Sequence, residues 1–299
     1  MRKVFVVIMA LLASAAHAEV IKIPWKGDYA HNGETVWSPE NKYHKSGLTK
    51  NFMNGAPEEN GVVQRDGFML ADLRRPQQDG PRPFVILMHG CSGANDPAVK
   101  RWSERLSKFL TAQGFGVLIL DSFSTRRVRA TCGSPNYHWG VRRAEDAYSA
   151  LDYLVYNKLA SPDDVFLVGR SNGALAAIMV TEDVQTRNHQ YRFAGSFAIS
   201  PTCLGLEKSV FASPIVIFAG DRDDAAGDPK VCESLNRPSG SPVRVIEFKG
   251  VTHGYEDEGA HHVFNGWRME YNEKAYQFTL ATIAALIKTK DFQRGLEFK

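Results

Sequence analysis

Apolar and polar positions follow two patterns along most of the chain. From about residue 61 onward, short apolar runs alternate with longer segments whose apolar positions recur every three or four residues. The first pattern predicts buried strands, and the second predicts amphipathic helices. The predicted strands cover residues 68–73, 83–88, 116–121, 165–168, 193–199, 214–219 and 243–248.

The predicted helices begin and end at typical capping residues. Asp96 followed by a proline is a common helix start, and Val99, Trp102 and Leu106 continue at helical spacing until Gly114. Strands that alternate with helices indicate an α/β fold, with a mostly parallel sheet covered on both faces and ligands at the carboxyl ends of the strands. Further helices are predicted over residues 141–154, 174–180, 228–235 and 271–287.

The first 18 residues have the pattern of a signal peptide. Arg2 and Lys3 precede an apolar run, which ends at the small-residue site Ala16-His17-Ala18. The run is shorter than the roughly 20 apolar residues that a membrane anchor needs. We therefore expect cleavage before Glu19 and a soluble, secreted or periplasmic protein without stable membrane association.

Residues 19–60 show no sustained periodicity and contain several aromatic side chains. This composition favours an N-terminal arm pinned to the domain by its aromatics over an aromatic strip that lines a substrate groove, because buried aromatics mostly serve packing. The rest of the chain, residues 61–299, is long enough for one large domain: the chain has 299 residues, of which 43% are hydrophobic and 23% charged.

The net charge gives no reason to expect nucleic acid or an anionic membrane as a partner. Arg2 and Lys3 contribute two charges to the formal net charge of +3, so the mature chain would carry +1. The sequence does not indicate an oligomeric state.

The four cysteines form an even set in a chain expected to be exported, which favours two disulfides over free thiols or a metal site. None forms a Cys-x-x-Cys pair, which disfavours zinc. Three pairings are open. We expect Cys91 to pair with Cys132 and Cys203 with Cys232, because each pair would tie neighbouring loops.

A serine lies between a predicted strand and a predicted helix. Gly169-Arg170-Ser171-Asn172-Gly173 matches Gly-x-Ser-x-Gly, the nucleophile elbow that exposes a serine hydroxyl at the carboxyl edge of a sheet. Chance alone supplies this short pattern in roughly one chain in ten. The strand before Ser171 and the small-residue helix after it make the match informative.

A nucleophilic serine needs a base, and the base needs a carboxylate that orients it. In elbow-type folds the acid and the histidine follow later strands in that order. Asp221, Asp223 and Asp224 follow one predicted strand, and we expect Asp223 to be the acid because its position leaves room for the chain to turn inward. His253 follows the next strand and is the expected base. No metal is expected at the later pair, His261 and His262, since no acidic ligands stand at suitable spacing.

An oxyanion needs two preorganised N–H donors. The N–H of Asn172 is the first candidate, and the N–H of Cys91 is the second because His89-Gly90-Cys91 follows a buried strand. His89 itself is expected to brace this loop.

Three arginines are candidates for binding a substrate carboxylate: Arg126, Arg127 and Arg170. Surface or structural ion pairs are the alternative and the favoured interpretation.

Taken together, these motifs resemble the dienelactone hydrolase family of α/β-hydrolases. The resemblance covers residues 61–299 and implies an α/β-hydrolase catalytic domain with Ser171, Asp223 and His253 as its triad. The family's namesakes use a cysteine nucleophile on enol-lactones, so this chain is more similar to serine-bearing, exported relatives with general esterase chemistry. The motifs are His89-Gly90-Cys91-Ser92-Gly93, Asp121-Ser122-Phe123, Arg143-Ala144-Glu145-Asp146-Ala147, Gly169-Arg170-Ser171-Asn172-Gly173, Gly220-Asp221-Arg222-Asp223-Asp224 and Thr252-His253-Gly254.

The expected function is hydrolysis of a small-molecule carboxylic ester or lactone through an acyl-enzyme, without a cofactor. Two alternatives stay open. One is a serine peptidase or acylamino-peptide hydrolase, although this chain has no length for the additional domain that restricts entry in its larger members. The other is a non-catalytic binding protein that kept the fold.

Overall fold

A computed structural model describes most of the chain from the first strand to the end of the last helix. Most of the predicted signal peptide and arm lie outside the described residues, as do Arg127 and the arm's aromatics after Trp25. The described residues are 17–25, 58–59, 62–63, 67–76, 82–126, 128–132 and 136–293.

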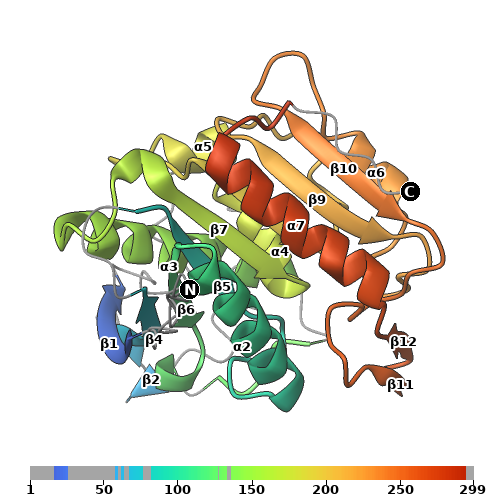
Figure 1. Ribbon diagram of the computed structural model, residues 1–299, viewed down its shortest axis with the longest axis horizontal. Coiled ribbons are helices and arrows are strands. Elements are labelled where there is room, and N and C mark those ends of the chain that lie inside the picture. Colours follow the sequence, from blue (N-terminus) through green and yellow to red (C-terminus); the bar gives the residue numbers. More distant parts are fainter. Residues whose placement is uncertain are drawn as a thin grey trace, which may run out of the picture.

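Eight strands form one central sheet (Figure 1). Their order is β1-β4-β6-β5-β7-β8-β9-β10. β4 is antiparallel to both of its neighbours, whereas all pairs from β6 to β10 are parallel, so the carboxyl ends of those strands meet at one edge. The strands are β1 (His17–Trp25), β4 (Gly67–Arg75), β5 (Phe84–Met88), β6 (Gly116–Asp121), β7 (Val165–Arg170), β8 (Gly195–Ile199), β9 (Ile215–Gly220) and β10 (Val243–Phe248).

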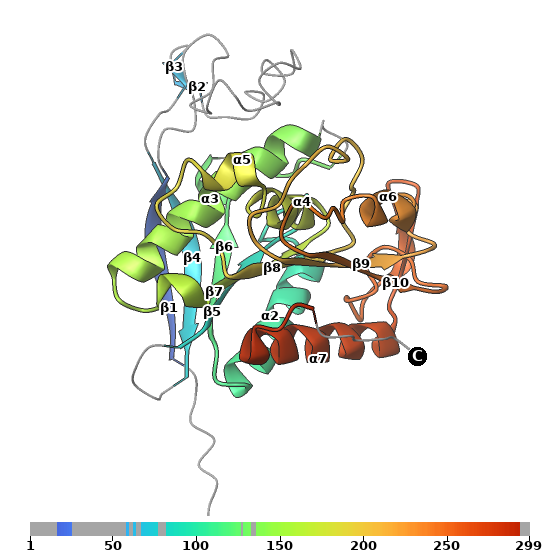
Figure 2. The ribbon, with the colours of Figure 1, turned by 90° about the horizontal axis from the view of Figure 1, so that it is seen from above.

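Helices cover both faces of the sheet (Figure 2). The side chains of β5 alternate between two cores: Phe84 and Ile86 pack toward α3 and α4, whereas Val85 and Leu87 pack toward α2 and α7. Because both faces of β5 are buried, its sequence is an uninterrupted apolar run. The predicted fold class, a mostly parallel α/β sheet of the α/β-hydrolase type, is confirmed. One face carries α3 (Asn136–Tyr156), α4 (Asn172–Met179), α5 (Asp183–Thr186) and α6 (Pro229–Glu233), and the other carries α2 (Pro97–Ala112) and α7 (Glu273–Thr289).

The start of α2 shows how local sequence sets a helix boundary. Asp96 Oδ1 accepts hydrogen bonds from the N–H groups of Ala98 at 2.9 Å and Val99 at 3.2 Å, as expected for an N-cap. Beyond the helix the chain turns at Gly114, whose φ of +91° suits glycine.

The first strand was not predicted. Ile21, Ile23 and Trp25 alternate as buried residues on β1, and the strand pairs antiparallel with β4 along its whole length. The beginning of the predicted arm is therefore an edge strand of the sheet. Trp25 lies over Gly67, where an added Cβ would come within 2.1 Å of the indole ring.

A hairpin between β10 and α7 was also not predicted. It consists of β11 (His261–Phe264) and β12 (Trp267–Glu270), which pair antiparallel. All four residues of β11 are exposed. A second small pair, β2 (Glu58–Glu59) with β3 (Val62–Val63), lies outside the central sheet. Within the described ranges, no helix has the length and hydropathy to cross a membrane.

Candidate active site

Ser171 lies at the sharp turn between β7 and α4. Its φ of +52° and ψ of −121° are the strained conformation expected of a nucleophile elbow, and its N–H donates to Ile199 O at 2.8 Å. An added Cβ would come within 2.0 Å of Gly173 O at Gly169, and within 2.3 Å of Met88 O at Gly173. Both glycines are therefore needed for the close approach of strand and helix.

The predicted acid and base come together with this serine. His253 Nε2 lies 3.0 Å from Ser171 Oγ, and His253 Nδ1 lies 2.9 Å from each carboxylate oxygen of Asp223. Asp223 Oδ1 also accepts from the N–H groups of Ala225 at 3.1 Å and Ala226 at 2.9 Å, which fixes the carboxylate. Asp223 and His253 follow β9 and β10, so neighbouring parallel strands deliver them to one edge of the sheet.

The two competing aspartates point elsewhere. Asp221 Oδ1 accepts from the N–H of Gly250 at 2.6 Å and joins the loops after β9 and β10. Asp224 is exposed, whereas Asp223 is only 4% exposed. Of the three, Asp223 alone contacts His253 among the described hydrogen bonds.

Charges around His253 favour its protonated form. Burial lowers the pKa of His253, but the charge and hydrogen bond of Asp223, with the charge of Glu256, outweigh burial and raise that pKa above its ordinary value. Burial raises the pKa of Asp223, but the charge and hydrogen bond of His253 outweigh it and hold that pKa below its usual range. Asp223 is therefore a carboxylate at neutral pH that stabilises an imidazolium.

The two candidate oxyanion donors lie beside Ser171. Asn172 is the first residue of α4, so its N–H has no partner within the helix. The Cys91 N–H belongs to the same peptide group as the carbonyl of Gly90, and hydrogen bonds to that carbonyl fix the peptide group. Gly90 O lies 2.7 Å from His89 Nδ1 and accepts from Gly93 N–H at 3.3 Å.

His89 braces this loop as a neutral ring. Its Nε2 accepts from the N–H of Ser122 at 3.3 Å, which places its proton on Nδ1, where it is donated to Gly90 O. Burial, with the positive charge of Arg143, lowers the pKa of His89 well below its usual range. The role agrees with the expectation from the sequence.

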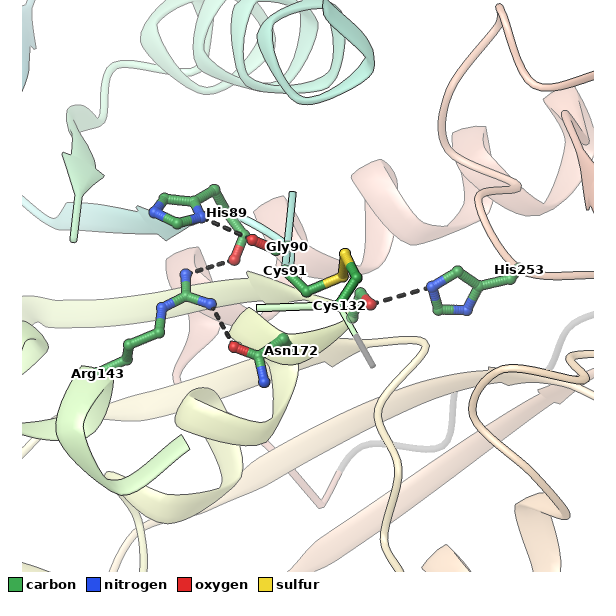
Figure 3. Close-up of a disulfide and its surroundings, with 8 residues drawn as sticks. His89, Gly90, Cys91, Cys132, Arg143, Asn172 and His253 are labelled. Atoms are coloured by element: carbon green, nitrogen blue, oxygen red, sulfur yellow. Dashed lines mark hydrogen bonds between the residues drawn. A yellow bond between two sulfur atoms is a disulfide. The ribbon is translucent and has the colours of Figure 1, made fainter. Parts of the chain in front are cut away.

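Both disulfides have the expected pairing. Cys91 is bonded to Cys132, and Cys203 to Cys232. Figure 3 shows the first bridge between Asn172 and His253, at the centre of the site. Cys91 O also accepts from the N–H of Thr131 at 2.8 Å, so the side chain and the carbonyl of Cys91 are both tethered.

A small cavity of about 40 Å³ lies over Ser171. Several of its lining residues were not candidates from the sequence, among them Ser200 and Trp267. Ser200, at the end of β8, has a φ of +52° like Ser171, and Trp267 comes from the unpredicted β11–β12 hairpin. The lining residues are Cys91, Cys132, Ser171, Asn172, Leu175, Ser200, Thr202, Ala225, Ala226, His253 and Trp267.

The structure corrects the candidate substrate-binding role of two arginines. Arg126 is fully buried and donates to both oxygens of Asp146, at 2.8 and 2.7 Å. Arg170 is 5% exposed, and its Nε lies 2.7 Å from Glu256 Oε1. Both guanidinium groups are therefore committed to buried ion pairs, the alternative favoured from the sequence. Arg127 lies outside the described residues.

In comparisons of sequence, no protein-family model and no curated protein matches this chain. Solved structures do match. Thermogutta terrifontis esterase 2, phosphoramylated by tabun, has a TM-score of 0.56 at 15% identity, over 80% of this chain and 96% of the esterase. A dienelactone hydrolase-like promiscuous phosphotriesterase from metagenomic libraries has a TM-score of 0.57 at 16% identity, over 91% of this chain and 98% of that one.

A third similar structure is a Klebsiella pneumoniae protein assigned as a dienelactone hydrolase. Its TM-score is 0.55 at 14% identity, over 74% of this chain and 93% of that protein. Identities in this range show a shared fold. At the level of the fold, the chain is similar to structures described as dienelactone hydrolase-like, as the resemblance of the motifs implied.

Proposed function

We propose that this protein is a serine hydrolase that cleaves carboxylic esters or lactones through an acyl-enzyme. The observation that carries the proposal is the hydrogen-bonded series Ser171–His253–Asp223, with contacts of 3.0 and 2.9 Å, beside two N–H donors at the mouth of a small cavity. A serine becomes nucleophilic when such a base can remove its proton. The similar structures named as esterases support the same class of chemistry.

The reaction would proceed in two steps. Ser171 Oγ attacks the ester carbonyl carbon while His253 Nε2 takes the hydroxyl proton, and the N–H groups of Asn172 and Cys91 hold the oxyanion. The tetrahedral intermediate collapses, and the leaving alkoxide takes the proton from His253. A water molecule then gives a proton to His253 and attacks the acyl-enzyme. When the second tetrahedral intermediate collapses, Ser171 Oγ leaves and takes that proton back from His253, which releases the acid and restores the free enzyme. In a lactone the leaving alkoxide stays attached to the acyl group.

Replacement of the serine tests the proposal. We expect Ser171→Ala to reduce turnover of p-nitrophenyl acetate and butyrate by at least about 10⁴-fold, and to abolish labelling by a fluorophosphonate probe. Ser103→Ala is the matched control, because Ser103 is buried on α2 and bonded to Lys100 O. Unchanged turnover in folded Ser171→Ala would refute the proposal, and faster cleavage of anilides than of esters would favour a peptidase.

We also propose export with cleavage after Ala18. The two disulfides support this, since they form in oxidising compartments. Cleavage would remove only the first two residues of β1, which pair with Arg75 and Arg74, and would leave the buried Ile21, Ile23 and Trp25 in place. Amino-terminal sequencing of the exported protein should begin at Glu19; a first residue beyond Ile21 would contradict the proposal.

A further inference from the structure

Arg143 lies on α3, behind the two segments that carry the candidate oxyanion donors (Figure 3). Its side chain is fully buried. Nη1 donates to Asn172 Oδ1 at 2.8 Å, and Nη2 donates to the carbonyl oxygen of His89. One guanidinium thus joins the start of α4 to the loop after β5.

The partners of Arg143 distinguish it from Arg126 and Arg170. Arg126 and Arg170 each pair with a carboxylate, whereas the two oxygens that Arg143 contacts are neutral. Its guanidinium also lies 5.2 Å from the centre of the Phe123 ring. A buried cation without a directly bonded carboxylate is costly, so its position calls for an explanation beyond packing.

The guanidinium keeps its charge at neutral pH. Burial lowers the pKa of Arg143 to about 9, while the carboxylates of Asp146 and Asp121 oppose this effect. The positive charge therefore stands against the two segments whose N–H groups would face the substrate oxygen. In a buried site such a charge acts with little screening.

The contacts of Arg143 also set the spacing of the two donors. The first hydrogen bond holds the side chain of Asn172, whose own N–H is one donor. The second holds the carbonyl of His89, two residues before Cys91, whose N–H is the other donor. An error of about 1 Å in such positions can cost a factor of 100 in rate.

We propose that Arg143 is a positioning residue for the oxyanion hole, which clamps the Asn172 and Cys91 segments together and supplies a positive charge behind them. The proposal rests on the serine hydrolase function proposed above. It assigns to Arg143 an effect on the transition state and not on substrate binding.

Two substitutions test the clamp. Arg143→Met removes the charge and both hydrogen bonds, and we expect kcat for p-nitrophenyl acetate to fall about 100-fold while KM changes less than about twofold. Arg143→Lys keeps the charge but has no planar fork with which to hold both oxygens, so we expect a smaller loss of about 10-fold. The inhibition constant of a trifluoromethyl ketone, which places an oxyanion in the hole, should rise by the same factor as kcat/KM falls.

Tyr148→Phe is the control that distinguishes loss of the Arg143 contacts from a general loss of stability. Tyr148 lies on the same helix, is buried, and donates to Val180 O at 2.6 Å, so its loss should lower the Tm without a change in kcat. If Arg143→Met does not fold, Asn172→Ala provides the second test, because it keeps the backbone N–H but removes the side chain that Arg143 holds. We expect it to reduce kcat about 10-fold.

The outcomes separate the two proposals. An active wild type, an inactive Ser171→Ala and an impaired Arg143→Met support both. Unchanged kcat or unchanged ketone affinity in folded Arg143→Met, or an equal loss of kcat in Tyr148→Phe, would overturn the clamp alone. A wild type that turns over no ester would overturn the hydrolase function and the clamp with it.

Discussion

Three charged side chains decide when His253 can act as a base. Against the burial that lowers its pKa, Asp223 and Glu256 raise that pKa, and Arg170 lowers it. A general base works only in its neutral form, so kcat/KM should fall as the pH drops through this raised pKa. The acid limb of the pH profile therefore has its midpoint above that of an ordinary histidine.

Glu256→Gln tests this electrostatic arrangement. Loss of the Glu256 charge leaves the positive Arg170 near His253, so the pKa of His253 should fall and the acid limb should move to lower pH. Arg170 also loses its buried partner, and we expect the free energy of unfolding to decrease by about 3–5 kcal/mol. The measurements are kcat/KM against pH and urea denaturation.

Glu258→Gln is the control for that substitution. Glu258 lies two residues further along, is 52% exposed at its side chain, and pairs with Arg105 at 3.4 Å. The acid limb of this variant should coincide with that of the wild type. The assignment of Glu256 as a group that raises the pKa of His253 would be contradicted by an acid limb that does not move in Glu256→Gln. It would also be contradicted by an acid limb that moves equally in both variants.

The two disulfides join different parts of the chain, the second one ending on α6 at Cys232, and they should separate effects on stability from effects on catalysis. Cys91 and Cys132 are 41 residues apart, and Cys203 and Cys232 are 29 apart. The chain-entropy model gives roughly 4 kcal/mol of stabilisation for each. Only the first bridge fixes a residue whose N–H is a candidate oxyanion donor.

We therefore expect different kinetics from two variants of similar stability. Cys91→Ser/Cys132→Ser should lose roughly 4 kcal/mol and also about 10-fold in kcat. Cys203→Ser/Cys232→Ser should lose similar stability with kcat nearly unchanged. Equal effects on kcat, measured at a temperature where both variants are folded, would show that the Cys91 bridge has no special role in the site.

At the scale of elements, the sequence predicted those helices and strands that have local signals, such as capping residues or a long apolar pattern. Helix α2 has an N-cap at Asp96 and ends just before Gly114, so both of its boundaries were predictable. β1 offers only three alternating buried residues, too few to stand out from an irregular segment. The β11–β12 hairpin is exposed on β11 and gives almost no apolar pattern.

The site was predictable where the fold fixes residue order, as for Ser171, Asp223 and His253. Arg143 was not, because a charged residue on a predicted helix normally faces solvent, and nothing local shows that its helix packs against the elbow. Ser200 shares this difficulty: its place beside the cavity depends on which strand lies next to β7. Such contacts arise only from the assembled sheet.

At the scale of the whole molecule, the first strand is part of the core, although it lies at the edge of the sheet and away from the site. Trp25 is 4% exposed and packs over Gly67. The centre of its ring lies 4.0 Å from the guanidinium carbon of Arg126. Arg126 in turn forms the fully buried ion pair with Asp146 of α3. The strand that begins the described chain thus supports the helix that presents Arg143.

Trp25→Ala should therefore destabilise the entire protein. Loss of a buried tryptophan typically costs about 3–5 kcal/mol, which urea denaturation followed by circular dichroism would measure. Trp267→Ala is the matched control, because Trp267 is only partly buried on the outer hairpin, and we expect a loss below about 1 kcal/mol. If this strand added no stability to the core, Trp25→Ala would be no more destabilising than Trp267→Ala. Because the strand supports α3, a large loss would mean that the stability of the site depends on the chain's first described residues.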